Sequence, residues 1–286
     1  MSLARRHREY IQSLTAASAP AMESGLAPAA ASDAAAGHAP IPAGGISTAA
    51  HTINLRMQVD LRRLKDIKSV ANKIAVKQVM IGEYRAWCDG LLEAGRNAER
   101  GPLAPTGADE VLPTIMVWAI DIGFWAYALE LAEHVLRHDV ALPARYKRDP
   151  ATLIVEQIAE AALNAQSAGN AFPIDVLEQV EALVDGIDMH DEVRAKLLKA
   201  IGTEVARGVD AASTDDARRL ATAAIERLAA AQALHDRVGV KTQIRGLEKV
   251  LAALPAPTPA RPLQELERAV DALQSATDTA GDKPAD

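Results

Sequence analysis

The sequence predicts an all-α protein, a helical bundle that contains a tetratricopeptide-like helical hairpin and follows a disordered leader. Alanine supplies much of the 49% hydrophobic content, whereas aromatic residues make up only 3%, and this balance favours helix over sheet. Apolar residues recur at spacings of three and four along most of the chain, and no segment alternates as a half-buried strand does. Glycines, prolines and Asp/Ser clusters separate the periodic segments.

The first segment is the leader. Residues 15–50 are rich in Ala, Pro, Gly and Ser, as in GLAPAAASDAAAGHAPIPAGG. Proline and glycine recur too often for a stable helix, and few large apolar side chains are present to be buried. We therefore predict a disordered leader over residues 1–51.

The next segment predicts one basic helix over residues 53–81. Six apolar residues step by three or four along one helical face: Met57, Leu61, Leu64, Ile67, Ala71 and Ile74. Seven basic residues occupy mainly the remaining surface: Arg56, Arg62, Arg63, Lys65, Lys68, Lys73 and Lys77. Eight basic and three acidic residues between positions 52 and 85 give a net charge of +5. Residues 52–100 are thus predicted to form a basic region that binds DNA or self-associates.

A second helix is expected over residues 83–95, with Gly95 near its carboxyl end. A loop with two glycines and two prolines follows, and Asp109 is a candidate N-cap for the next helix. Pro113 would lie in the first turn of that helix, where its missing N–H is tolerated.

Residues 111–143 predict a helical hairpin. Two helices, over 111–120 and 125–138, flank a tight break at Asp121–Gly123, and Pro143 ends the unit. Small residues such as Ala128 and Ala132 recur where two helices approach closely. This pattern is typical of a tetratricopeptide-like hairpin. Charged residues interrupt the apolar run well before the roughly 20 residues that a membrane span needs.

The rest of the chain predicts an acidic helical body over residues 101–254. Further helices are expected over 150–168, 174–184, 191–202, 215–234 and 242–254. Asp188 is a candidate N-cap for the helix that begins at Asp191. Residues 255–286 are predicted to be a linker and flexible tail with one short helix over 263–273.

The charge distribution limits the classes of function. The net charge is −7, which excludes a uniformly basic nucleic-acid-binding protein. However, residues 1–100 carry 13 Lys and Arg against 9 Asp and Glu, a net +4, whereas the remaining residues carry 18 against 29, a net −11. This asymmetry predicts a basic arm on an acidic body. The single cysteine, Cys88, excludes an intrachain disulfide and is interpreted as an inert buried thiol. No signal peptide is recognisable at the amino terminus.

Motifs for catalysis are weak. The sequence contains no phosphate-binding loop, no dinucleotide-binding fingerprint and no nucleophile elbow. His134 and His138 have the i, i+4 spacing of a metal-binding pair but lack a recognisable third ligand. Asp121 and Glu130 are weak candidates for a catalytic carboxylate pair, which would require Mg²⁺ if the chain cuts DNA itself. Otherwise no cofactor is expected.

The basic helix is the strongest candidate for binding. Lys and Arg neutralise the phosphates of double-stranded DNA, so we expect its affinity for DNA to depend strongly on salt. A second basic cluster, Arg145, Lys147 and Arg148, follows Pro143 and is also a candidate for phosphate contact. For the basic helix, the alternative is a soluble helix face with ion pairs to Asp60 and Asp66.

Three segments within residues 52–250 are distinctive in combination: YRAWCDGLLEAG, DEVLPTIMVWAIDIGFWAYALELAEHVLRHDVALPARYKR and MHDEVRAKLLKAIG. Together they resemble the small terminase subunit of cohesive-end tailed phages of the peduovirus type. The resemblance implies a DNA-packaging subunit that recognises the cohesive-end site in concatemeric phage DNA and directs its cleavage with the large terminase subunit. It also implies a homo-oligomer in the cytoplasm of the bacterial host, without a membrane partner.

Two alternatives remain open. The family is described as an endonuclease subunit, so the chain is alternatively a metal-dependent DNA endonuclease in its own right, although its residues show no nuclease motif. The second alternative is a non-enzymatic helical scaffold that binds only protein. Family members are expected to end in a basic tail, whereas this chain ends in GDKPAD. This difference shifts the expected DNA contact to the basic helix.

Overall fold

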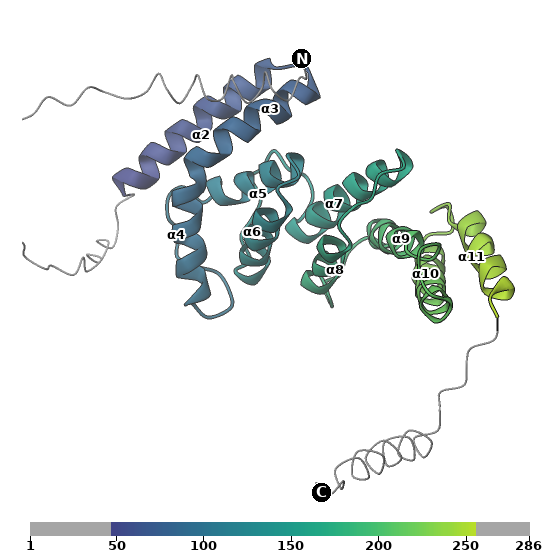
Figure 1. The fold of residues 1–286 in the computed structure, drawn as a ribbon. Helices are drawn as coiled ribbons and strands as arrows, with labels where there is room; N and C mark the ends of the chain where they lie inside the picture. The colour runs from purple at the N-terminus through teal and green to yellow at the C-terminus, as the bar shows by residue number, and fades with distance from the viewer. Residues whose placement is uncertain (1–46, 256–286) are drawn as a thin grey trace, which may run out of the picture. The chain divides into compact units, whose positions relative to one another are not determined.

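The computed structural model describes residues 47–255, and this part of the chain is entirely helical apart from its turns and loops (Figure 1). The all-α prediction is confirmed. The helices are α2 (Thr48–Asp66), α3 (Val70–Met80), a 3-10 turn η1 (Ile81–Tyr84), α4 (Arg85–Arg96), α5 (Val111–Asp121), α6 (Trp125–Arg137), α7 (Pro150–Ser167), α8 (Ile174–Leu183), α9 (Asp191–Arg207), α10 (Thr214–Leu234) and α11 (Lys241–Ala253). Most of the predicted leader and the predicted 263–273 helix lie outside the described residues.

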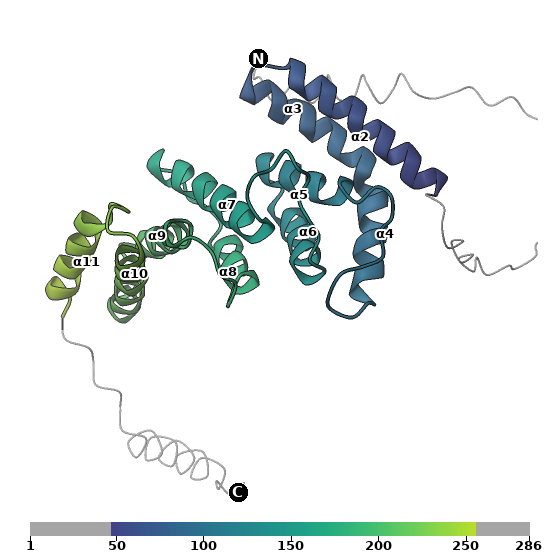
Figure 2. The same ribbon diagram turned by 180° about the vertical axis from the view of Figure 1, so that it is seen from behind.

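The single basic helix predicted over residues 53–81 is wrong, because the chain breaks there into two helices. The backbone is extended at Ile67, and the Ser69 hydroxyl accepts a hydrogen bond from the Asn72 amide at 3.4 Å, which starts α3. The two helices lie side by side as a hairpin (Figure 2). The apolar spacing continues across the break, so periodicity alone did not reveal it. The first helix also begins earlier than predicted, since Ser47 caps it through the Ala50 amide.

The hairpin predicted over residues 111–143 is confirmed as α5 and α6. Every residue from 111 to 120 is buried. The chain reverses at Gly123, whose φ of +74° is readily adopted only by glycine. Pro113 lies in the first turn of α5, as expected. In the described part of the chain, none of the helices combines the length and apolar character needed to cross a bilayer.

Two predicted helix caps are wrong. Asp109 accepts hydrogen bonds from the amide and hydroxyl of Thr106, within the loop, and α5 has no side-chain cap. His190, not Asp188, precedes α9, and its side chain makes no capping bond. In both cases the helix begins one or more residues away from the acidic side chain, which is therefore out of reach of the free amides.

Gly95 and Gly202 mark close helix contacts. Gly95 is the second-last residue of α4, near the end of its helix as expected, and it is buried against the His134 ring. The α9 helix continues through Gly202 to Arg207, beyond its predicted end. A Cβ at Gly202 would lie 2.8 Å from Leu228 Cγ, so this glycine allows α9 and α10 to pack closely.

The described helices bury two clusters of apolar side chains. The larger cluster joins α2 through α9, so residues on both sides of position 100 share one core. The smaller cluster lies between α10 and α11 and also contacts the end of α9. The predicted domain boundaries within the described part remain predictions, because a shared core neither requires nor excludes a functional division.

Candidate nucleic-acid interface

Four basic residues at the turn of the α2–α3 hairpin are exposed: Arg62, Arg63, Lys65 and Lys68. We call them the hairpin-tip cluster. None of them forms an ion pair with another residue in the range 47–255. Three of them lie within the last five residues of α2. Basic side chains at the carboxyl end of a helix also interact favourably with the helix dipole. This cluster therefore presents concentrated positive charge to solvent.

The remaining basic residues of the predicted basic helix are less available to contact DNA phosphates than the hairpin-tip cluster. Lys77 pairs with Asp121 at the end of α5, and both side chains are largely shielded from solvent. Arg56 lies 3.0 Å from the Glu83 carboxylate, although that pair is solvent-exposed. Lys73 is half-buried and forms no ion pair among the described residues. The structure thus divides the seven predicted basic residues into four that are exposed without an ion pair and three that are ion-paired or half-buried.

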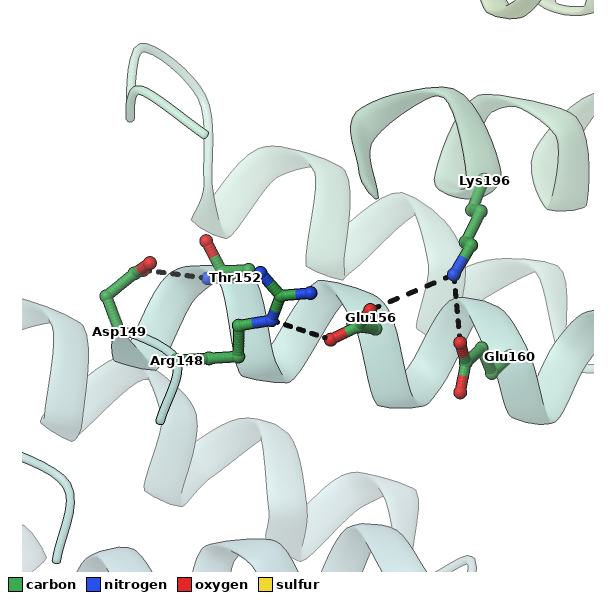
Figure 3. Close-up of polar contacts among 6 residues, drawn as sticks. All are labelled: Arg148, Asp149, Thr152, Glu156, Glu160 and Lys196. Atoms are coloured by element: carbon green, nitrogen blue, oxygen red, sulfur yellow. Dashed lines mark hydrogen bonds and ion pairs between the residues drawn. The ribbon is translucent and has the colours of Figure 1, made fainter. Parts of the chain in front are cut away.

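Two bases of the second cluster are also engaged within the protein. Arg145 lies 3.3 Å from Glu110, donates to the Thr114 hydroxyl and stacks over the Tyr146 ring at 5.0 Å. Arg148 lies 3.3 Å from Glu156 (Figure 3). Only Lys147 of the three is exposed without an ion pair to another described residue.

The segment DEVRAK has a packing role in the structure. Lys196 lies 2.9 Å from Glu160 and 3.8 Å from Glu156, so it joins α9 to α7 (Figure 3). Hydrogen bonding to Glu160 outweighs burial and raises the pKa of Lys196. Arg194 donates to the carbonyl of Ile187 at 2.8 Å, just beyond α8. These two side chains hold α9 against the preceding helices.

The two weak catalytic candidates lie on different helices. Asp121 ends α5 and is bound by Lys77, whereas Glu130 is exposed on α6. Within residues 47–255, no three His, Cys, Asp or Glu side chains are grouped closely enough to hold a metal ion.

His134 and His138 form a buried pair with ring centroids 4.8 Å apart. The His138 ring nitrogens lie 2.9 Å from the Gly101 carbonyl oxygen and 3.1 Å from the Gly95 carbonyl oxygen. Since carbonyls only accept hydrogen bonds, a ring nitrogen that carries a hydrogen donates to the carbonyl beside it. Burial, and secondly the neighbouring His138, lowers the pKa of His134 to about 4. His138 thus ties the end of α4 and the loop after it to the end of α6.

Cys88 is fully buried, and this burial raises the pKa of its thiol to about 12. A thiol with such a pKa is almost entirely protonated at neutral pH and is a poor nucleophile. This agrees with the interpretation of Cys88 as inert.

A second apolar stripe on α2 was not predicted from the sequence. Leu55 and Val59 are 49% and 59% exposed, and Val70 and Val79 on α3 are 71% and 80% exposed. The i, i+4 spacing of Leu55 and Val59, on the side of α2 opposite the buried Met57 and Leu64, was the available signal. Exposed apolar side chains that lie together on a surface often mark a contact with another protein.

Comparison with known proteins places these features in a family. Residues 54–192, from α2 into the start of α9, match the family model described as phage small terminase subunit. The chain is also 34% identical over 205 residues to a protein of Escherichia phage P2 named "Terminase, endonuclease subunit", covering 72% of this chain and 75% of the relative. No solved structure matches significantly. The chain therefore belongs to the family of phage small terminase subunits and has a role in phage DNA packaging.

Proposed function

We propose that this protein recognises the cohesive-end site in concatemeric phage DNA and directs its cleavage together with the large terminase subunit, in the cytoplasm of the bacterial host. Family membership supports the packaging role. The observation that carries DNA recognition is the hairpin-tip cluster, whose four exposed bases have no acidic partner among the described residues. Such bases are free to replace the counterions around DNA phosphates. Lys73 and Lys147 are secondary candidates, whereas the ion-paired bases mainly position the helices.

Salt-dependent binding to duplex DNA tests this proposal. The parent is titrated with a duplex carrying the phage's cohesive-end site and with a scrambled duplex, each over a salt series. The test variant changes the hairpin-tip cluster to Ala at all four positions. Losing four phosphate contacts is expected to flatten the slope of log K against log salt by up to about 3.6.

A matched control changes four exposed bases near and along α11 to Ala: Arg237, Lys241, Arg245 and Lys249. It removes the same charge from another part of the chain. We expect it to retain most of the affinity and the slope of the parent. Equal losses of DNA affinity in both variants would mean that net charge alone explains the effect. Failure of the parent to bind either duplex at low salt would refute direct recognition of DNA by this chain.

We also propose that the protein self-associates through the exposed apolar stripe on the α2–α3 hairpin. Burying Leu55 and Val59 against a second copy would remove them from water, which is favourable by roughly 25 cal/mol per Å². The molar mass by light scattering tests this. A Leu55→Asp/Val59→Asp variant is expected to have a smaller mass than the parent, whereas Leu103→Asp, in the exposed loop after α4, should not. A monomeric parent would exclude self-association.

The name of the phage P2 relative favours a second candidate, cleavage of DNA by this chain itself. Asp121 and Glu130 are then the residues to test. Mg²⁺-dependent cutting of the cohesive-end duplex by this chain without the large subunit, lost in Asp121→Asn or Glu130→Gln, would support this candidate. Cutting that requires the large subunit and survives both substitutions would assign the chemistry to the partner.

A further inference from the structure

A groove of about 710 Å³ lies between α6 and α8, two helices that pack side by side (Figure 1). Its apolar lining comes from Trp125 and Leu129 on α6 and from Val176 and Leu183 on α8. At one end the Trp125 ring packs against Phe172, with centroids 5.0 Å apart, which holds the indole at the groove wall. The groove is therefore built from well-packed helices and not from a loop.

The rim of this groove is acidic. Glu130, Glu133 and Asp175 line it, whereas no Lys, Arg or His does. All three carboxylates are exposed, and none forms an ion pair with another residue of the 47–255 range. Arg137, one turn beyond Glu133, donates to the Ala98 carbonyl at 3.2 Å. Among the described residues these carboxylates thus have no ion-pair partner, although Arg96 and Arg137 line an adjoining hollow beside Glu130 and Glu133.

The dimensions fit a short peptide segment. The lining residues extend from position 125 to 133 on α6 and from 173 to 183 on α8. At about 1.5 Å of rise per residue, these walls are about 12 and 15 Å long, which corresponds to two or three turns of an added helix. The volume lies within the roughly 300–1,000 Å³ of pockets that hold a drug-sized ligand, which gives room for a few side chains of a peptide. An amphipathic helix that lays apolar residues into a groove is a common mode of recognition.

We propose that the α6–α8 groove docks a segment of the large terminase subunit that carries apolar residues flanked by Lys or Arg. This inference rests on the proposed partnership with that subunit. Charge complementarity selects the segment, because unpaired carboxylates on both walls attract a basic flank and repel an acidic one. The groove and the hairpin-tip cluster lie on different helices and carry opposite charge. The acidic groove thus suits a basic protein segment, and the basic hairpin-tip cluster suits DNA.

A charge reversal at the rim tests the proposal. Glu133→Lys changes the groove, whereas Glu178→Lys makes the same change at an exposed residue of α8 that does not line it. Affinity for the purified large subunit of the same phage is measured for the full-length chain and both variants over a salt series. We expect Glu133→Lys to weaken binding by about tenfold at low salt and Glu178→Lys by less than about twofold. Thermal melting verifies that both variants fold.

Site-specific cross-linking identifies the occupant. A photo-cross-linking amino acid at Gln179, which lines the groove, is compared with the same amino acid at the neighbouring Glu178. Mass spectrometry should recover a basic, apolar segment of the large subunit from Gln179 only. Cross-links to residues 1–46 of this chain, or to a second copy, would overturn the assignment of the partner.

The outcomes separate this inference from the proposed function. If both charge variants bind the large subunit as tightly as the parent, the groove is not the docking site, although the partnership stands. If the parent itself does not bind the large subunit, both the partnership and this inference are wrong, while recognition of DNA by the hairpin-tip cluster remains a separate result.

Discussion

The α2–α3 and α5–α6 hairpins have the same secondary structure but opposite relations to solvent. In the first, only Ala50, Met57, Leu64 and Met80 are buried, and four large apolar side chains are exposed. In the second, α5 is buried from residue 111 to 120 and α6 buries one face. The first hairpin also carries the hairpin-tip cluster, whereas α5 has no basic residue.

The two hairpins are therefore expected to differ in what they contribute to stability and to binding. A helix that buries all of its faces contributes to the core but offers nothing to a partner. A helix that buries only a narrow stripe keeps its other side chains exposed, and these can contact DNA or a second copy of the chain. The α5–α6 hairpin is therefore expected to contribute more to stability, and the α2–α3 hairpin to contribute more to binding DNA and a second copy of the chain.

The largest effect is expected from Trp118 of α5. Its side chain is 2% exposed and meets the Tyr84 ring edge-on at a centroid distance of 5.8 Å. Trp118→Ala should lower the free energy of unfolding by about 3–5 kcal/mol, because it leaves a cavity in the core. Val79→Ala on α3 should change it by less than about 0.5 kcal/mol. Urea denaturation measures both, and equal losses would refute the contrast between the hairpins.

Acid is expected to weaken the attachment of α6 through His134. Its pKa is lowered from 6.5 to about 4 in the folded protein. Between these values the unfolded chain takes up a proton that the folded chain does not, so the free energy of unfolding falls as the pH falls below about 6.5. At pH 5 this contribution amounts to about 2 kcal/mol relative to pH 7.5.

The measurement compares urea denaturation at pH 7.5 and pH 5 for the parent and His134→Gln. The variant should lose less stability than the parent over this interval. His51→Gln, at an exposed position of α2, serves as the control and should keep the pH dependence of the parent. An unchanged pH dependence in His134→Gln would mean that His134 protonates without cost in the folded protein.

A smaller effect is expected where α4 meets α6. A Cβ at Gly95 would lie 2.5 Å from His134 Cε1 and 3.0 Å from His138 Nε2, so Gly95→Ala forces the buried rings to move. We expect a loss of about 1–3 kcal/mol. A Cβ at Gly90, in the same helix, meets nothing within 4 Å. Gly90→Ala should therefore stabilise the protein by about 0.5–1 kcal/mol, as alanine does in a helix. Thermal melting measures both variants. Changes in melting temperature of the same sign for Gly95→Ala and Gly90→Ala would contradict the close contact at Gly95.

The smallest effect is expected from the hydrogen bond that attaches the first hairpin to the core. The Tyr84 hydroxyl donates to the Asp60 carboxylate of α2 at 2.7 Å. Burial and this carboxylate raise the pKa of Tyr84, so the hydroxyl stays protonated. Tyr84→Phe should cost about 1 kcal/mol. A double-mutant cycle with Asp60→Ala, which removes the acceptor, isolates the bond. A coupling energy near zero would show that this hydrogen bond does not help to attach α2.

Much of the fold was predictable because local patterns decide it. The helix content, the α5–α6 hairpin and its break at Gly123 follow from apolar spacing and from one glycine with positive φ. The break between α2 and α3 was not predicted, because the apolar stripe continues through it and only the Ser69 cap and the extended Ile67 mark it.

The candidate sites divide in the same way. The sequence alone determined which residues are basic, and from them a DNA-binding region was predicted. Only the tertiary structure decided that Lys77 meets Asp121 and Arg148 meets Glu156, while the hairpin-tip cluster has no acidic partner among the described residues. It also brought α6 and α8 together around an acidic groove. The reason is physical: helical periodicity depends on neighbours three or four residues away, whereas an ion pair or a groove depends on residues that only the packing of helices brings together.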